Sequence, residues 1–222
     1  PITIRCARVL ILPELKSAPA SHPVENAHTG PLRETTLSRD DQTALFISRV
    51  EEQTGIVYRL EKTWTAEDLM ASVFSEHGLK TAVASCEPVL SELELTAKAR
   101  QKGLDIKPQT DFASRSDFRD AVFEWADAGI TGAAAGVAES GTLILDFSPD
   151  HARLISLAPP VHIAVLPEDR IIPVYEAALD PIYSKSPPSQ TVFITGPSMT
   201  ADIQGTPFKG MHGPQKLIVL LV

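Results

Sequence analysis

The chain has 222 residues, of which 43% are hydrophobic and 22% charged, a composition typical of a globular protein with one large domain. Its formal net charge of −8 disfavours sequence-independent binding to nucleic acid, which depends on a surplus of lysine and arginine. The longest uninterrupted apolar run, residues 217–222, is far shorter than the roughly 18 residues of a membrane-spanning helix. Since no secretory signal pattern is visible either, we expect a cytoplasmic protein whose partners include neither nucleic acid nor a membrane.

The side chains that commonly hold metal ions and clusters are sparse and scattered. The two cysteines, Cys6 and Cys86, are far apart and form no C-x-x-C pair, so the sequence predicts neither a disulfide framework nor a cysteine-bound cluster. The histidines show no H-x-H or H-E-x-x-H spacing, which gives a metal site little support. We therefore expect no metal and no cofactor bound by this chain itself.

The first 37 residues differ in pattern from the rest of the chain. Residues 2–12 can form a strand, whereas residues 13–31 are rich in Pro, Ser, Ala and His, which is typical of a loop or arm. Regular helix and strand signals begin only at Ser38. We therefore divide the chain into an N-terminal extension or arm, residues 1–37, and a domain, residues 38–222.

Helices and strands alternate in the first half of the domain. Helix starts are predicted where a hydroxyl residue is followed three positions later by an aspartate, at Ser38, Thr65 and Ser114. A further helix is predicted from Pro88 to Gly103. Strands are predicted between these helices at residues 56–60, 80–84 and 104–106.

The second half of the domain is richer in strands. These are predicted at residues 142–147, 161–166, 191–195 and 217–222, with a helix over 173–183 among them. Strands that are apolar throughout, such as 217–222, are typical of parallel sheets covered on both faces. We therefore predict an α/β fold with a mostly parallel sheet flanked by helices, in which ligands bind outside the carboxyl ends of the strands.

The first candidate site is the glycine-rich segment GITGAAAGVAESGTLIL, residues 129–145, which holds a single carboxylate. Its G-x2-G-x3-G spacing matches neither the dinucleotide nor the P-loop fingerprint, and G-x-S-x-G is absent. Glu139 is either a general base or nucleophile beside an anion site, or a turn carboxylate bonded to backbone amides. The candidate ligand-binding residues here are Gly132, Gly136, Ser140, Gly141 and Thr142.

The second candidate site is TGPSMTADIQG, residues 195–205, directly after a predicted strand. A Gly-Pro turn followed by hydroxyl residues predicts a short helix, whose N-terminus either binds an anion or carries only an N-cap. The candidate ligand-binding residues are Thr195, Gly196, Ser198 and Thr200.

The third candidate site is KGMHGP, residues 209–214, just before the last strand. His212 lies between turn-forming residues and is either held in a fixed pose for chemistry, with Asp202 orienting its imidazole, or is a structural turn residue. Lys209 and Gly213 complete the ligand-binding candidates.

Taken together, residues 129–145, 154–173 and 194–214 resemble the LUD domain of the lactate-utilisation protein C family, also called YkgG-like. The resemblance covers about residues 38–222. It implies a fold like that of the NagB/RpiA/CoA-transferase superfamily. It also implies a role in oxidising L-lactate to pyruvate with two cysteine-rich iron–sulfur proteins as partners. This chain would then be the subunit without clusters, and the clusters would lie in the partners.

Three functions are therefore carried forward. The first is the cluster-free or accessory subunit of an iron–sulfur complex that oxidises lactate. The second is a stand-alone enzyme that acts on a small anionic acid, an acyl-CoA or a sugar phosphate through Glu139, with His212 and Asp202 as further catalytic candidates. The third is a binding module that senses an anionic metabolite.

Overall fold

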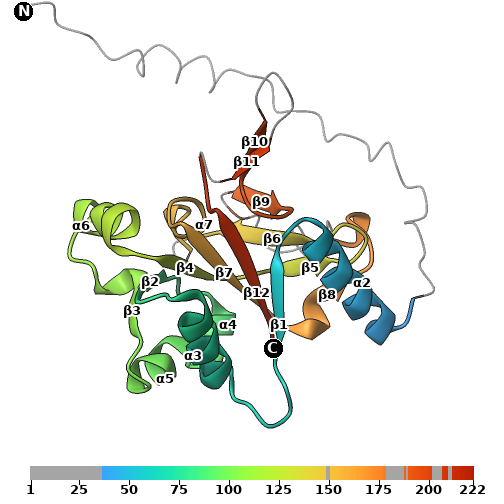
Figure 1. The fold of residues 1–222 in the computed structure, drawn as a ribbon, viewed down its shortest axis with the longest axis horizontal. Helices are drawn as coiled ribbons and strands as arrows, with labels where there is room; N and C mark the ends of the chain where they lie inside the picture. Colours follow the sequence, from blue (N-terminus) through green and yellow to red (C-terminus); the bar gives the residue numbers. More distant parts are fainter. Residues whose placement is uncertain (1–36, 149–150, 179–187, 189, 202–206, 210–211) are drawn as a thin grey trace, which may run out of the picture. The chain divides into compact units, whose positions relative to one another are not determined.

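A six-stranded sheet carries the fold of the computed structural model (Figure 1). The strand order is β1-β12-β7-β4-β2-β3, and every pair of neighbours is parallel. This confirms the predicted α/β class with a mostly parallel sheet. In that order the strands are Ile56–Arg59, Lys216–Leu221, Val161–Leu166, Ala128–Gly132, Thr81–Ala84 and Asp105–Pro108.

The structure describes residues 37–148, 151–178, 188, 190–201, 207–209 and 212–222, without the side chains of 201 and 207–209. The predicted extension, apart from its last residue, lies outside this part of the chain, as does Asp202. Within the part that is described, no helix is long and apolar enough to cross a bilayer.

Three helices begin at the predicted N-caps. In α2 (Arg39–Glu52) and α6 (Arg115–Asp120), the hydroxyls of Ser38 and Ser114 accept hydrogen bonds from backbone amides three residues later, at 3.2 and 3.1 Å. In α3 (Ala66–His77), Thr65 and Asp68 form a reciprocal capping box, and Gly78 ends the helix with a left-handed φ of 64°. These side chains satisfy amides that the first turn of a helix leaves open.

The predicted helix from Pro88 to Gly103 is wrong as one continuous element. It is split into α4 (Pro88–Glu92) and α5 (Leu95–Gln101), because Glu94 has a φ of 50°, which a right-handed helix cannot continue. After α6 the chain passes into a π-helical turn, Ala121–Trp125. Of the helix predicted over 173–183, residues 176–178 are helical and 179–183 lie outside the described residues.

A second, four-stranded sheet has the order β8-β5-β6-β9. Its strands in that order are Ile171–Ile172, Ala135–Val137, Thr142–Phe147 and Gln190–Ile194. Leu143 and Leu145 of β6 pack with Phe46 of α2 and with apolar side chains of β7 and β12. This sheet and α2 therefore cover one face of the six-stranded sheet.

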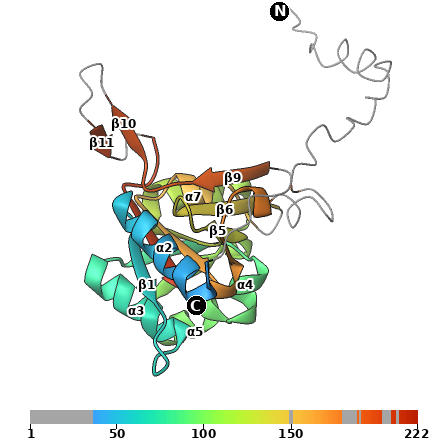
Figure 2. The ribbon, with the colours of Figure 1, turned by 90° about the vertical axis from the view of Figure 1, so that its right-hand side faces the viewer.

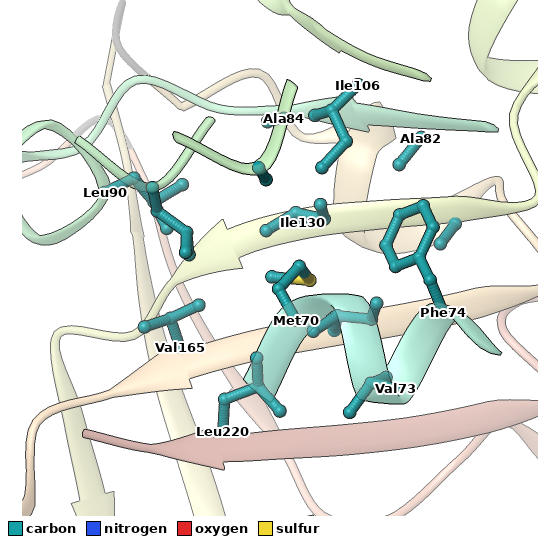
Figure 3. Packing of buried hydrophobic residues seen from close by; sticks show 14 of the residues in the cluster. Met70, Val73, Phe74, Ala82, Ala84, Leu90, Ile106, Ile130, Val165 and Leu220 are labelled. Atoms are coloured by element: carbon teal, nitrogen blue, oxygen red, sulfur yellow. The ribbon is translucent and has the colours of Figure 1, made fainter. Parts of the chain in front are cut away.

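Helices α3, α4 and α5 cover the other face. Met70 and Phe74 of α3 pack with Ile130, Val165 and other apolar side chains of the parallel strands (Figure 3). In Figure 2, β5, β6 and β9 lie on one side of the six-stranded sheet and α3 and α5 on the other. Both faces are thus buried, as the apolar strands predicted.

The short helix predicted after Ser198 is wrong. Residues Met199–Ala201 form strand β10, which pairs antiparallel with β11 (Pro207–Lys209). Pairing between strands satisfies backbone groups that a helix of a few residues would leave open. The anion site predicted at that helix N-terminus therefore has no helix to form it.

The connections after the neighbouring strands β2 and β4 leave on opposite faces of the sheet. After β2 the chain enters α4, whose Val89 and Leu90 pack with Ile130 on the α3 side. After β4 it enters β5, and Ala133 packs with Leu143 on the side of the second sheet. Such a point of divergence leaves a crevice at the carboxyl ends of the strands, where α/β proteins bind ligands.

A short helix, α7 (Leu154–Leu157), lies directly against β4. A Cβ atom added at Gly129 would lie 1.8 Å from the carbonyl oxygen of Ile155, so no other residue fits there. This close approach fixes α7 against β4. His151 lies in the segment directly before α7.

We expect Gly129→Ala to lower the free energy of unfolding by about 3 kcal/mol, because the new methyl meets backbone that cannot move aside. Gly78→Ala is the control: its Cβ would meet nothing within 4 Å and would cost about 1 kcal/mol for the left-handed φ alone. Urea denaturation of both variants measures the difference. Equal losses would contradict the close packing of α7 on β4.

Candidate functional site

Glu87 lies in the crevice between the diverging connections of β2 and β4. Its Oε2 accepts a hydrogen bond from the amide of Gly132, at 3.3 Å, and another from the hydroxyl of Ser85. The amide of Ser85 in turn donates to the carbonyl oxygen of Ile130 at 3.0 Å. The carboxylate therefore bridges the two strand ends, and its side chain is only 13% exposed.

His151 is the second titratable side chain of this crevice. Its Nδ1 lies 2.5 Å from Oε1 of Glu87, without the alignment of a hydrogen bond, and its side chain is completely buried. The ring forms a T-shaped contact with Phe147, with the centroids 4.6 Å apart. The next residue, Ala152, donates its amide to Oε1 of Gln109, at 3.0 Å, beyond the end of β3. Segments that follow β2, β3 and β6 thus hold the imidazole in one pose.

The other ring nitrogen of His151 has no such partner. A carboxylate beside Nδ1 favours a proton on that nitrogen, and in the neutral ring Nε2 then carries a lone pair. Nε2 is buried and makes no hydrogen bond to any residue that the structure describes. An unsatisfied buried polar atom costs about 1–3 kcal/mol, so its presence needs an explanation.

His151 lines a cavity of about 1030 Å³. The walls come from residues 109–119, from the connection between β6 and α7, and from β9. Three arginines, Arg115, Arg119 and Arg153, line the cavity, and none of its described lining residues is acidic. In a chain with a net charge of −8, such a cavity concentrates positive charge and favours an anion.

The three arginines differ in their partners. Arg119 forms an ion pair with Asp120 at 2.7 Å, and Arg153 donates to Oε1 of Gln190 at 2.8 Å. Arg115 is exposed and has no hydrogen-bond or ion-pair partner among the residues placed by the structure. A guanidinium carries five donors, so Arg153 also keeps capacity for an anion.

A second buried histidine, His162 on β7, lies beneath this site. Its Nε2 is 2.8 Å from the hydroxyl of Thr131 on β4. Burial lowers the pKa of His162 to about 3. The ring therefore stays neutral at physiological pH and serves packing.

The structure brings together part of the first two candidate sites. The hydroxyl of Thr142 lies 2.7 Å from that of Thr195 and 2.8 Å from that of Ser140. Tyr175, which the sequence analysis did not select, completes the cluster at 2.5 Å from Thr142. These four hydroxyls hydrogen-bond to one another.

Glu139 lies beside this hydroxyl cluster. Its Oε1 accepts a hydrogen bond from the amide of Tyr175 at 3.2 Å, and its own amide donates to the carbonyl oxygen of Pro173 at 3.2 Å. These contacts fit the interpretation of Glu139 as a carboxylate that binds backbone amides. Its catalytic role stays a prediction.

The glycines of the candidate sites make room for packing. Gly141 and Gly196 have left-handed φ values of 66° and 77°, and a Cβ on either would lie 2.5 or 2.8 Å from the backbone of α2 or of Gln53, its C-cap. A Cβ on Gly136 would meet Leu166 at 2.6 Å.

The end of α2 leads through Gly55 to the amino end of β1 (Figure 1). The turns at Gly141 and Gly196 pack on this end of α2, whereas Glu87 follows the carboxyl end of β2. These turns therefore do not lie at the carboxyl edge of the sheet, and their role in ligand binding stays a prediction. Of the candidate residues, Gly132 lies at that edge, where its amide donates to Glu87.

The third candidate site lies just before β12. The amide of Ser198 donates to the carbonyl oxygen of Pro214 at 2.9 Å, and a Cβ on Gly213 would lie 3.1 Å from that of Ser198. Thr200 is in β10, and His212 is exposed. The side chain of Lys209 and all of Asp202 lie outside the described part, so orientation of His212 by Asp202 stays a prediction.

The sequence analysis missed Glu87, His151 and the arginines of the cavity. Glu87 lies three residues after the end of a predicted strand and directly before Pro88, so the rule that ligands bind at strand ends pointed to its neighbourhood. No spacing or motif links it to His151. Their contact arises only from the topology of the sheet.

The LUD domain family model matches residues 43–222. This chain belongs to the LUD domain family. An uncharacterised protein of Neisseria meningitidis serogroup B is 30% identical to this LUD domain protein over 224 residues, which cover 97% of this chain and 93% of that protein.

Relatives with a functional name match shorter parts of this LUD domain protein. Lactate utilization protein C of Anoxybacillus flavithermus is 30% identical over 155 residues, or 70% of this chain and 69% of the relative. The protein of the same name from Bacillus subtilis is 40% identical over 104 residues, or 45% and 43%. A crystal structure of a DUF162 family protein from Deinococcus radiodurans shares the fold, with a TM-score of 0.60 at 24% identity over 84% of this chain and 99% of that one.

The buried neutral His162 predicts a pH dependence of stability. Its pKa is about 3 in the folded state and about 6.5 when unfolded, so below pH 6.5 the unfolded state binds more protons. The free energy of unfolding should therefore fall by about 1.4 kcal/mol per pH unit from this group between about pH 6 and 4. Urea denaturation across this range should show a shallower slope for His162→Gln, whereas the exposed His212→Gln should keep the wild-type slope. Equal slopes in all three proteins would contradict the assignment.

Proposed function

We propose that this LUD domain protein is the cluster-free subunit of an assembly that oxidises L-lactate to pyruvate. The family assignment and the relatives named lactate utilization protein C support a place in lactate utilisation. The sequence contains two cysteines, Cys6 and Cys86, and an iron–sulfur cluster generally needs four thiolates. In this proposal the clusters belong to cysteine-rich partner proteins.

The single observation that supports a role of this chain itself is the arginine-lined cavity at the carboxyl edge of the sheet. An arginine-lined cavity with an unpaired imidazole nitrogen among the described residues suits a subunit that receives a small organic acid. In the described part of the chain, no group of three or more His, Cys, Asp or Glu side chains could hold a metal ion. The proposal assigns acid binding to this chain and electron transfer to the partners.

The proposal predicts stable association with iron–sulfur proteins. Affinity purification of the tagged full chain from its native host, grown on L-lactate and lysed without oxygen, should yield a brown complex with two cysteine-rich proteins. The same purification from cells that carry the tag alone is the control.

A deletion strain should grow poorly on L-lactate and normally on pyruvate, because only the oxidation step is lost. A colourless chain that copurifies with neither protein, together with normal growth of the deletion strain on L-lactate, would contradict the proposal.

A further inference from the structure

We propose that the arginine-lined cavity binds a 2-hydroxy carboxylate, with the carboxylate on Arg115 and Arg153 and the hydroxyl donating to Nε2 of His151. The choice of a 2-hydroxy acid rests on the proposed function. The binding of an organic anion rests on the cavity alone.

The carboxylate is assigned to the arginines because they are the cationic side chains among the cavity's described lining residues. Arg115 has no partner in the described part of the chain, and Arg153 uses one donor on the neutral Gln190. Arg119 is already paired with Asp120. Guanidinium groups bind carboxylates through charge-assisted, often bidentate hydrogen bonds.

The hydroxyl is assigned to His151 because Nε2 is a buried acceptor without a partner among the described residues. The ligand's hydroxyl would remove the cost of that orphaned atom, whereas an acid without a hydroxyl would not. A site built to hydrogen-bond a hydroxyl rejects the analogue that lacks it. His151 therefore accepts the hydrogen bond of the hydroxyl, and the arginines bind the carboxylate.

Glu87 acts on the ligand only through His151, as a positioning residue. Its contact with Nδ1 selects the tautomer that leaves Nε2 as an acceptor. The amide of Gly132 and the hydroxyl of Ser85 hold the carboxylate itself. This arrangement explains why a carboxylate is buried at the divergence of β2 and β4.

The apolar part of the cavity allows a side chain on the acid. Phe112, Phe118 and Leu154 line the cavity, and its 1030 Å³ is far more than a three-carbon acid fills. The cavity therefore also admits 2-hydroxy acids that are longer than lactate.

Calorimetric titration of the full chain with L-lactate, propionate and inorganic phosphate tests the site. We expect L-lactate to bind at one site, and propionate, which lacks the hydroxyl, to bind about tenfold more weakly. The double variant Arg115→Gln with Arg153→Gln should lower the affinity for both acids at least about tenfold, because two charge-assisted contacts are lost. Lys62→Gln with Lys216→Gln removes the same charge from exposed positions outside the cavity lining and should change neither affinity.

The preference for L-lactate over propionate isolates His151. In His151→Gln and in Glu87→Gln we expect this ratio to fall from about ten to about one, while propionate affinity stays the same. Glu168→Gln, which removes a carboxylate paired with Arg59 elsewhere, should keep the ratio. If either site variant fails to fold, the arginine variant still tests the carboxylate contact, since both arginines are exposed, and the wild-type preference for L-lactate still tests the hydroxyl contact.

No binding of any probe to the wild-type chain, or no effect of the double arginine variant, would overturn the inference. Equal affinity for L-lactate and propionate, or tighter binding of phosphate, would overturn the 2-hydroxy acid assignment. Binding as expected without copurified iron–sulfur partners would reject the proposed function and keep this site. Copurified iron–sulfur partners, with no binding of the acids to the chain, would keep the proposed function and reject this site.

Discussion

The contact between Glu87 and the ends of β2 and β4 is the constraint on which the candidate site depends. Neighbouring parallel strands whose connections leave on opposite faces open a crevice at their carboxyl ends. The polar groups that face this crevice need hydrogen-bond partners. Here a carboxylate binds the amide of Gly132 on one side and approaches Nδ1 of His151 on the other. One side chain thus closes the edge of the sheet and fixes the orientation of the imidazole.

The pose of His151 also depends on close packing behind it. Because Gly129 has no side chain, the backbone of α7 lies directly on β4. The segment before α7 then reaches back to Gln109 after β3 and to Glu87 after β2. The arginines enter the same cavity from α6 and from the start of α7, so elements far apart in sequence meet at one edge.

Local signals in the sequence predicted most of the fold but little of the cavity. Capping residues such as Thr65 and strands such as Val161–Leu166 follow from short-range pattern and were found. Thr142 and Thr195, which were selected in two separate candidate sites, are brought together only by the pairing of β6 with β9. The glycine pattern alone did not predict what lies beside it, because Gly141 and Gly196 make room for the end of α2. A glycine pattern does not tell whether backbone or a ligand fills the space that the missing side chain leaves. Glu87 and His151 carry no shared motif, since only strand order brings them together.

Long-range proton–nitrogen NMR of the full chain, with the histidine rings labelled with nitrogen-15, tests the central claim most directly. We expect the ring proton of His151 on Nδ1, beside Glu87, and an unprotonated Nε2 whose signal moves when L-lactate is added. A ring with its proton on Nε2, or an Nε2 signal that does not change when L-lactate is added, would contradict the claim that Glu87 leaves Nε2 as an acceptor for a ligand.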